Sequence, residues 1–302
     1  MGPTAVGKTG LALEIAGNGF EIVSADSVQV YRYMDVGSGK PSKDELASVP
    51  HHLIDIVDPD YDFSVGDFCR LAFRSSMDIL SKDRLPLFVG GTGLYIDSFF
   101  KGISDIPEVA EEVREELKKD LTDRGINVLY DELQKHDPGF ASRIHTRDVQ
   151  RILRGLEVWR GTGKAISEYY STSKGHGSED TLYIGLNIER SALYDRINQR
   201  VDVMIKSGLV DEVHHLLEMG YNRGLKSLKS IGYEELLCYF EKRISLNDAI
   251  AEIKKNTRHY AKRQLTWFRR NKNIIWFNPA DKGMITECIE EWMYNINSKS
   301  KE

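Results

Sequence analysis

The chain has 302 residues, of which 41% are hydrophobic and 29% charged, the composition of an ordinary globular protein with one large domain or two smaller ones. Its formal net charge of −5 gives no overall sign of a nucleic-acid partner. No apolar run approaches the ~18 residues that a membrane span needs, so no membrane association is expected. The isolated cysteines, Cys69, Cys238 and Cys288, favour the reducing cytoplasm over a disulfide framework.

A phosphate-binding motif opens the chain. Residues 2–9 read GPTAVGKT, which matches the pattern G-x-x-x-x-G-K-[ST]. In such a loop the backbone N–H groups surround phosphate oxygens, Lys8 adds a positive charge, and the Thr9 hydroxyl can bind Mg²⁺. A helical pattern to Ile15, a glycine turn and a short strand at Glu21–Ser24 follow, as the motif requires. The predicted ligands of a di- or triphosphate are Gly2, Pro3, Thr4, Ala5, Val6, Gly7, Lys8 and Thr9.

The strand that normally leads into such a loop is missing, because only Met1 precedes Gly2. A buried strand of this kind contributes about four or five apolar residues at roughly 1.5–3 kcal/mol each, which rivals a typical net stability of roughly 5–15 kcal/mol. We therefore expect the natural protein to have several more residues before Met1.

The rest of the first hundred residues alternates between strand and helix patterns. Strands are expected at Leu53–Val57 and Pro86–Val89, with a helix at Phe68–Leu80 between them. This alternation predicts an α/β fold, with a P-loop NTPase-like parallel sheet sandwiched by helices.

The middle of the chain has a different character. Residues 105–180 are helical and charged and end in a polar segment, whereas strand patterns return at Thr181–Leu186 and Ile274–Phe277. An all-helical block between sheet strands indicates an insertion. We therefore expect a catalytic core of residues 1–104 and 181–302, with an all-helical insertion domain at 105–180.

Two further segments should lie at the phosphate site. Asp26 and the glycine-rich turn Gly90–Gly93 each follow a predicted strand, and the carboxyl ends of parallel strands meet at one edge of a sheet. The Asp26 carboxylate could be a metal ligand, a general base or the cap of a turn. A P-loop hydrolase usually places an Mg²⁺-binding Asp where Gly90 stands. That difference weakens an ATPase interpretation and leaves open a transferase that does not hydrolyse the phosphate.

Basic residues are concentrated in two places. Residues 254–272 carry eight bases and no acid, whereas residues 105–120 carry seven acids against three bases. Helical spacing predicts one basic stripe in each helical region, a pattern that is common on solvated surfaces. The interleaved aromatic residues suggest RNA or single-stranded nucleic acid instead. The first stripe is Arg143, Arg147, Arg151 and Arg154; the second is Lys254, Arg258, Lys262 and Arg269, with Tyr260, Trp267 and Phe268 between them.

Adjacent histidines do not predict a metal site. His51 and His52 fall in or beside a strand, where neighbouring side chains point to opposite faces. His214 and His215 lie about 100° apart on a predicted helix. No zinc site is therefore expected.

Taken in order, the motifs resemble those of bacterial tRNA dimethylallyltransferases, also called tRNA isopentenyltransferases. The resemblance spans nearly the whole chain, and DSVQVYR, GGTGLY and AKRQLTWFR are far more specific than the phosphate loop. The matching segments are GPTAVGKT (2–9), SADSVQVYRYMDVGSGKP (24–41), VPHHLID (49–55), LFVGGTGLYI (87–96), QRILRGLEV (150–158), LYDRINQRVDVMI (193–205), SIGYEEL (230–236) and YAKRQLTWFR (260–269).

The resemblance implies a reaction. A dimethylallyl group passes from dimethylallyl diphosphate to the exocyclic amine of the adenosine immediately 3′ of the anticodon (tRNA position 37), and diphosphate is released. The implied cofactor is Mg²⁺ at Thr9, the implied partner is the anticodon stem-loop of tRNA, and a cytoplasmic monomer is expected. The phosphate loop then holds the leaving group rather than a nucleotide undergoing hydrolysis.

The resemblance also implies residue roles. Asp26 takes the proton of the amine, while Lys8, Thr92 and Arg200 complete the catalytic set. The implied tRNA contacts are Asp26, Ser27, Val28, Gln29, Thr92, Arg114, Gln150, Arg151, Ile152, Leu153, Arg154, Lys229, Ser230, Ile231, Gly232, Tyr233, Glu234, Lys262, Arg263, Gln264, Leu265, Thr266, Trp267, Phe268 and Arg269.

Three alternatives remain at this point. A P-loop small-molecule kinase would use the same phosphate site and would not need the basic helices. An isopentenyltransferase acting on free adenine nucleotides would have little use for a tRNA-clamping insertion. A non-enzymatic RNA-binding module would not need Lys8 and Asp26.

Overall fold

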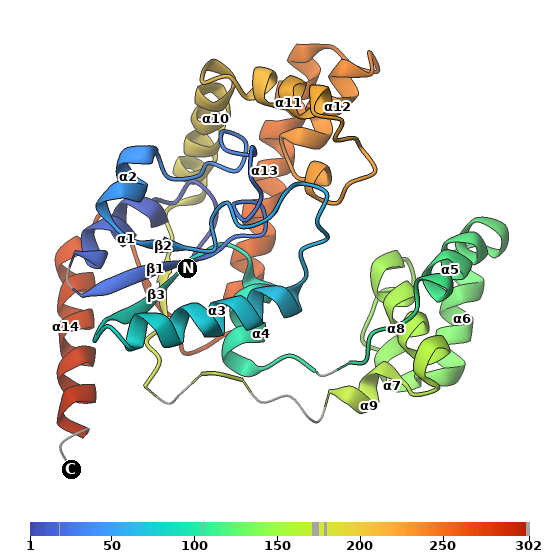
Figure 1. Cartoon of the computed structure of the whole chain (residues 1–302), viewed down its shortest axis with the longest axis horizontal. Helices are drawn as coiled ribbons and strands as arrows, with labels where there is room; N and C mark the ends of the chain where they lie inside the picture. The colour runs from blue at the N-terminus through green and yellow to red at the C-terminus, as the bar shows by residue number, and fades with distance from the viewer. Residues whose placement is uncertain (18, 105, 171–174, 178–179, 300–302) are drawn as a thin grey trace. The chain divides into compact units, whose positions relative to one another are not determined.

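The computed structural model divides into two compact units, each with its own hydrophobic core (Figure 1). The larger unit comprises Met1–Phe100 and Gly177–Glu302, and the smaller comprises Lys101–His176. The boundaries expected from the sequence lie close to these. The structure describes residues 1–17, 19–104, 106–170, 175–177 and 180–299.

The larger unit contains two parallel sheets. In the first, β1 (Phe20–Ala25) lies between β2 (His51–His52) and β3 (Leu85–Gly90). The second sheet pairs β4 (Ile184–Leu186) with β5 (Ile275–Phe277). Four of the five predicted strands are therefore confirmed, and their ends differ from the prediction by at most three residues.

The predicted strand at Leu53–Val57 is wrong. The segment that pairs with β1 is β2, immediately before it. Leu53 and Asp55 have φ values of 64° and 55°, a left-handed backbone that cannot continue a pleated strand. Val57 retains only an isolated parallel bridge to Tyr31. The apolar run therefore forms a bent loop beside the sheet.

The helices of the larger unit cover both faces of β1. Ile22 packs with Ala12 and Ala16 of the helix that follows the phosphate motif, whereas Val23 packs in a different cluster that contains Phe68. Alternate residues of a strand face opposite ways, so the two clusters lie on opposite sides of the sheet. The helices are α1 (Lys8–Ala16), α2 (Lys43–Ser48), α3 (Val65–Leu80), α4 (Gly93–Lys101), α10 (Arg190–Lys206), α11 (Leu209–Glu218), α12 (Tyr233–Phe240), α13 (Leu246–Phe268) and α14 (Lys282–Lys299), with a 3₁₀ turn at Ser227–Lys229.

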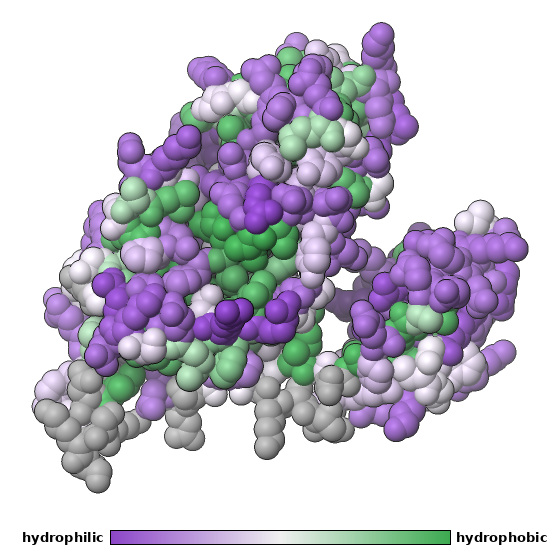
Figure 2. All heavy atoms as spheres, viewed as in Figure 1, coloured by the Kyte–Doolittle hydropathy of each residue, from purple (hydrophilic) through white to green (hydrophobic). Residues whose placement is uncertain are grey.

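The described part of the smaller unit is helical and has no strand. Leu129, Leu133, Ile152 and Leu156 form the centre of its core. Its visible surface is mostly hydrophilic, in keeping with its charged sequence (Figure 2). Most of the polar segment 171–180 lies outside the described residues. The helices are α5 (Glu111–Arg124), α6 (Ile126–His136), α7 (Pro138–Ala141), α8 (Val149–Thr162) and α9 (Ile166–Tyr169).

The start of the chain is attached to β4. The Met1 ammonium donates a hydrogen bond to the Ile184 carbonyl at 2.8 Å, and the Met1 carbonyl accepts one from the Leu186 N–H at 2.9 Å. The phosphate-binding motif therefore begins from a backbone that is fixed to the second sheet. Within the described residues, no helix has both the length and the apolar character that a membrane crossing requires.

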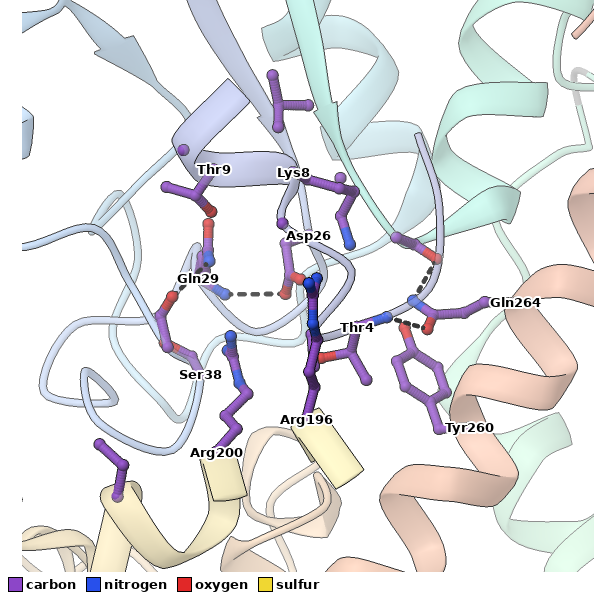
Figure 3. A pocket seen from close by; sticks show the side chains of 18 of the residues that line it. Thr4, Lys8, Thr9, Asp26, Gln29, Ser38, Arg196, Arg200, Tyr260 and Gln264 are labelled. Atoms are coloured by element: carbon purple, nitrogen blue, oxygen red, sulfur yellow. Dashed lines mark hydrogen bonds between the residues drawn. The ribbon is translucent and has the colours of Figure 1, made fainter. Parts of the chain in front are cut away.

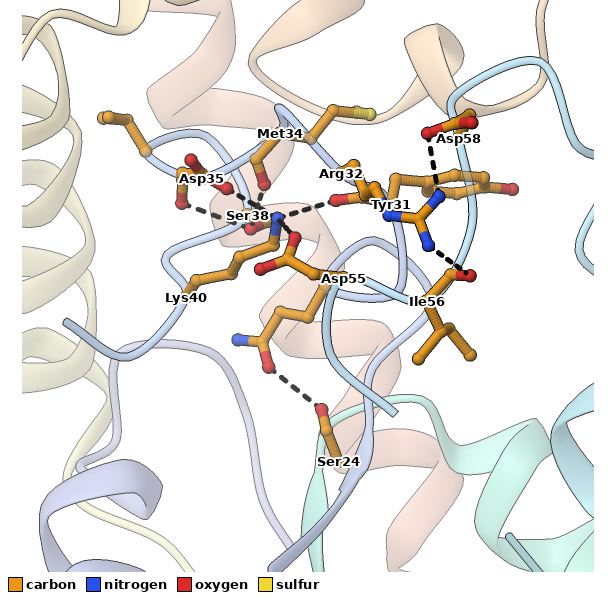
Figure 4. A network of polar contacts seen from close by, with 12 residues as sticks. Ser24, Tyr31, Arg32, Met34, Asp35, Ser38, Lys40, Asp55, Ile56 and Asp58 are labelled. Carbon is orange, nitrogen blue, oxygen red and sulfur yellow. Dashed lines mark hydrogen bonds and ion pairs between the residues drawn. The ribbon is translucent and has the colours of Figure 1, made fainter. Parts of the chain in front are cut away.

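A buried lysine organises the loop after β1 (Figure 4). The Lys40 side chain is only 4% exposed, and its ammonium donates to the Tyr31 carbonyl and the Asp35 carboxylate at 2.6 Å each. It also contacts the Asp55 carboxylate. One cation thus joins both ends of the 31–40 loop to the segment after β2.

Replacing Lys40 with methionine should destabilise this loop. The variant leaves a buried carbonyl and two partly exposed carboxylates without their cation, which should cost about 1–3 kcal/mol of unfolding free energy. Urea unfolding of Lys40→Met measures the loss, and Lys43→Met at an exposed position is the matched control. Equal stability of the two variants would contradict the assigned role of Lys40.

Candidate active site

A cavity of about 410 Å³ lies at the carboxyl ends of β1 and β3 (Figure 3). Its wall consists of the phosphate-binding motif, the residues that follow the two strands, and side chains of α10 and α13. This edge of a parallel sheet is where such folds bind ligands. Three of the four predicted catalytic residues, Lys8, Asp26 and Arg200, line the cavity.

The phosphate-binding motif has the backbone of an anion cradle. Ala5 and Gly7 have φ values of 63° and 107°, so the chain turns back on itself before α1 begins. No side chain caps the N-terminus of α1. The first N–H groups of a helix lack intrahelical partners, and together with the helix dipole they favour an anion.

The Lys8 side chain folds back toward the start of the phosphate-binding motif. Its ammonium donates to the carbonyls of Gly2 and Pro3 at 3.1 and 2.8 Å. Burial lowers the pKa of Lys8 to about 8, the nearby Asp26 raises it, and Arg200 lowers it further. The cavity therefore holds a cation that lacks a full counter-charge, and a phosphate would supply that charge.

Asp26 both caps a turn and faces the cavity. Its Oδ1 atom accepts hydrogen bonds from the N–H groups of Val28 at 2.9 Å and Gln29 at 3.4 Å. The turn-cap interpretation is thus correct for one oxygen. No described residue donates a hydrogen bond to the other, Oδ2. A carboxylate anchored by one oxygen has the second available to accept a proton.

Two arginines of α10 point into the cavity (Figure 3). Arg196 and Arg200 are one helical turn apart, and Arg196 donates to the Val6 carbonyl at 3.4 Å. Burial lowers the pKa of Arg200, and Asp26 raises it. Sequence analysis missed Arg196, although its i,i+4 spacing from Arg200 places both on one helix face.

Gln264 ties two glycine-rich segments together. Its Oε1 atom accepts from the Thr4 N–H, and its Nε2 donates to the Gly91 carbonyl, each at 2.9 Å. The side chain is 5% exposed and lines the cavity, and its contact with tRNA stays a prediction. A Cβ on Gly91 would lie 2.1 Å from Nε2, which explains the glycine there.

Tyr260 lines the cavity together with Gln264, whereas Thr92 belongs to the turn after β3. The Thr92 hydroxyl accepts from the Ser27 N–H at 3.1 Å, which fixes the turn that carries Asp26. Thr92 is not among the residues that line the cavity. Burial, together with the Asp26 charge, raises the pKa of Tyr260 to about 12, so the phenol keeps its proton at neutral pH.

The other side chains of the 26–29 turn are also engaged. Gln29 accepts from the Ser24 hydroxyl at 2.9 Å and donates to the Gly39 carbonyl at 3.2 Å. It lines the cavity, whereas Val28 packs against the core.

Several predicted tRNA contacts of the larger unit are buried or bonded to other residues of the chain, and their contact with tRNA stays a prediction. Tyr233 is fully buried and Phe268 is 3% exposed. Trp267 donates its indole N–H to Asp97 at 2.7 Å, and Glu234 pairs with Arg223. The exposed members of the set are Lys229, Lys262, Arg263, Thr266 and Arg269. Ser230, Ile231 and Leu265 are half-buried, and Gly232 is buried.

The first two residues of the second basic stripe make contacts within the protein. Lys254 pairs with Asp202 at 2.6 Å, and Arg258 donates to Asn198 at 2.7 Å. Both partners belong to α10, so these two bases join α13 to α10. Only the part of the stripe after Arg258 remains as exposed basic surface.

In the smaller unit the predicted arginine stripe is wrong. Arg143 and Arg147 lie in the connection between α7 and α8, because Asp148 caps a helix that begins only at Val149. Ile152 is fully buried and Leu153 half-buried, whereas Gln150 and Arg151 are exposed. Arg114 and Arg154 both donate to Glu157 at 2.8 Å, so each has a structural partner.

Comparison with known proteins identifies the family. The model of the IPP transferase family matches residues 29–271, and that of isopentenyl transferases matches residues 1–56. The chain belongs to the IPP transferase family. It is 45% identical to tRNA dimethylallyltransferase 1 of Syntrophotalea carbinolica over 97% of this chain and 94% of the relative. A relative in Thermoanaerobacter sp., named tRNA dimethylallyltransferase, is 48% identical over 93% of this chain and 91% of its own length.

Solved structures agree. The tRNA isopentenylpyrophosphate transferase of Bacillus halodurans superposes with a TM-score of 0.73 at 39% identity, covering 100% of this chain and 97% of that one. A eukaryotic dimethylallyltransferase acting on tRNA gives a TM-score of 0.74 at 29% identity, covering 88% and 68%. The chain is thus a prenyl-transferring enzyme with the fold predicted from its sequence, and the kinase alternative is not favoured.

The depressed pKa of Lys8 predicts proton uptake when an anion binds. Near pH 8 about half of the Lys8 side chains are neutral in the free protein, and a bound diphosphate should restore their charge. Calorimetry of inorganic diphosphate binding in two buffers of different ionisation enthalpy measures this uptake. It should decline at pH 6.5, where Lys8 is already charged.

The control for that measurement is Lys8→Met. In this variant, diphosphate itself can still take up or release protons on binding, but the proton uptake by Lys8 is absent. Equal proton uptake by both proteins at pH 8 would show that Lys8 does not titrate there.

Proposed function

We propose that the protein transfers a dimethylallyl group from dimethylallyl diphosphate to the exocyclic amine of the adenosine immediately 3′ of the anticodon, position 37, in tRNA. The observation that carries this proposal is the cavity itself, where an anion cradle and the free oxygen of Asp26 face the same space. The names of the relatives, which act on tRNA, support the same reaction.

The phosphate end of the cavity suits a leaving group. Negative charge develops on the diphosphate as its bond to the allylic carbon breaks. Lys8, Arg196, Arg200 and the N–H groups of α1 surround the region where that charge would lie. Fixed positive groups of this kind stabilise a transition state without reorganising.

Mg²⁺ is the cofactor we propose. The Thr9 hydroxyl lines the cavity beside Lys8, and the described residues contain no group of three or more carboxylate, histidine or cysteine side chains placed to hold a metal ion. This fits an ion held by one hydroxyl, phosphate oxygens and water, which is how Mg²⁺ often binds. When bound, Mg²⁺ would supply additional positive charge at the diphosphate.

Asp26 serves as the general base. An adenine exocyclic amine is a weak nucleophile, so its proton must leave as the new C–N bond forms. Oδ2 of Asp26 accepts this proton while Oδ1 keeps the turn in place. The adenine must leave the base stack to enter the cavity, as in other enzymes that modify bases.

Surface residues of both units are available for the anticodon stem-loop. Lys262, Arg263 and Arg269 are exposed on or just after α13, the helix that also supplies Tyr260 and Gln264 to the cavity wall. In the smaller unit the exposed candidates are Gln150 and Arg151. Cations at these positions would contact phosphates, which fixes orientation more than sequence. We expect a cytoplasmic monomer.

Incubation with dimethylallyl diphosphate and Mg²⁺ tests the substrate. Unmodified tRNA and AMP are offered in parallel, and nucleosides are analysed by mass spectrometry. We expect a dimethylallyl adduct on the adenosine next to the anticodon and none on AMP. Adduct on AMP alone would instead support an enzyme of free adenine nucleotides.

Asp26→Asn tests the base. Asparagine keeps the oxygen that caps the turn but cannot take up the proton, so the transfer rate should fall by about 10²–10⁴-fold. The dissociation constant for tRNA, measured by filter binding, should be unchanged.

Asp26→Ala is the companion variant. It removes the cap as well as the base and should be equally inactive while still binding tRNA. Turnover of Asp26→Asn near the wild-type rate would refute the assignment of Asp26.

A further inference from the structure

Glu212 makes four hydrogen bonds although it does not line the cavity. It lies on α11, and its Oε2 atom accepts from the N–H groups of Asp35 at 2.8 Å and Val36 at 2.7 Å. Its Oε1 atom accepts from the Gly37 N–H at 3.0 Å and from the Tyr233 hydroxyl at 2.7 Å. A single carboxylate thus holds three successive backbone groups of the loop that follows β1.

This arrangement suits a charged acceptor. Successive N–H groups that converge on one point form an anion-binding concavity, and hydrogen bonds to a carboxylate are stronger than those to a neutral oxygen. Burial, with the Glu212 charge beside it, raises the pKa of Tyr233, which therefore remains a donor. A Cβ on Gly37 would lie 2.6 Å from the Tyr233 ring, so the loop fits closely against α12.

The clamped loop continues directly into the active site. Ser38 and Gly39 line the cavity, and the Gly39 carbonyl accepts a hydrogen bond from Gln29. Gly39 has a φ of 60°, and a Cβ there would lie 1.9 Å from Nη2 of Arg200. The loop backbone is therefore the surface against which the Arg200 guanidinium rests. A shift of this loop would move that guanidinium.

We propose that Glu212 is a positioning residue for catalysis, which acts through residues 35–39 on Arg200. Held against Gly39, the Arg200 guanidinium is directed at the charge that develops on the departing diphosphate. This inference rests on the proposed role of Arg200. A purely structural Glu212 would stabilise the loop without any specific dependence on that arginine.

Glu212→Gln is the informative substitution. An amide has the same shape, but it must turn its NH₂ group toward at least one of the backbone N–H donors that the carboxylate now accepts. At saturating dimethylallyl diphosphate, kcat should fall about 10- to 100-fold, because small displacements of catalytic groups have effects of this size. The KM for tRNA should stay within about twofold. Glu218→Gln, at an exposed carboxylate of the same helix, is the matched control and should retain wild-type kcat.

A double-mutant cycle with Arg200→Ala distinguishes positioning from general stability. If Glu212 acts through Arg200, adding Glu212→Gln to Arg200→Ala should reduce kcat by less than about threefold further, since coupled residues are not additive. The full 10- to 100-fold loss in the Arg200→Ala background would overturn the inference. So would a Glu212→Gln enzyme as active as Glu218→Gln.

If Glu212→Gln fails to fold, Tyr233→Phe provides an independent test. It keeps the carboxylate and its three backbone donors and removes one hydrogen bond. We expect a smaller fall in kcat that likewise disappears in the Arg200→Ala background, and persistence of that fall would refute the inference. Failure of the proposed role of Arg200 has a different signature, because Arg200→Ala alone would then keep the wild-type rate. Failure of the proposed function itself would leave the wild-type protein without transfer to tRNA.

Discussion

The site depends on one side-chain amide that joins two glycine-rich segments of the chain. The phosphate loop and the Gly90–Gly93 turn must lie side by side, and both are glycine-rich. Gln264 accepts from the Thr4 N–H of one and donates to the Gly91 carbonyl of the other. An amide does both at once, whereas a carboxylate cannot donate and an ammonium cannot accept. Because Gln264 belongs to α13, the long helix is fixed to the same two segments.

The buried charges of the cavity indicate which kind of ligand it binds. Lys8 and Arg200 have lowered pKa values because burial disfavours their charges, and Asp26 only partly offsets that burial. Burying several cations in one cavity lowers the free energy of unfolding of the protein. A diphosphate would recover that free energy, so the excess of positive charge favours an anionic ligand. Among the described residues that line the cavity, Asp26 is the one carboxylate beside Lys8, Arg196 and Arg200, so it cannot neutralise the cations fully.

The sequence was informative wherever a signal is local. The phosphate motif, β1, β3 and α3 each follow from residues within a short window, and the fold class follows from their alternation. Burial is set by packing between distant parts of the chain and has no local signal. Motif similarity marked Tyr233, Phe268 and Ile152 as tRNA contacts, yet packing decides exposure and places all three in cores. Glu212 left no sequence signal, since its partner Gly37 lies 175 residues away along the chain.

One helix links recognition to chemistry in this arrangement. Along α13, Lys254 and Arg258 are used to join α10, whereas Lys262 and Arg263 stay at the surface. Gln264 directly follows Arg263 but faces inward, because neighbouring residues on a helix are about 100° apart. The distance from these exposed cations to the cavity is thus fixed by a rigid helix rather than by a mobile loop. Under the proposed function, a tRNA seated on those cations would present its adenine at a constant position relative to Asp26, and selection of that nucleotide would follow from geometry more than from reading the base.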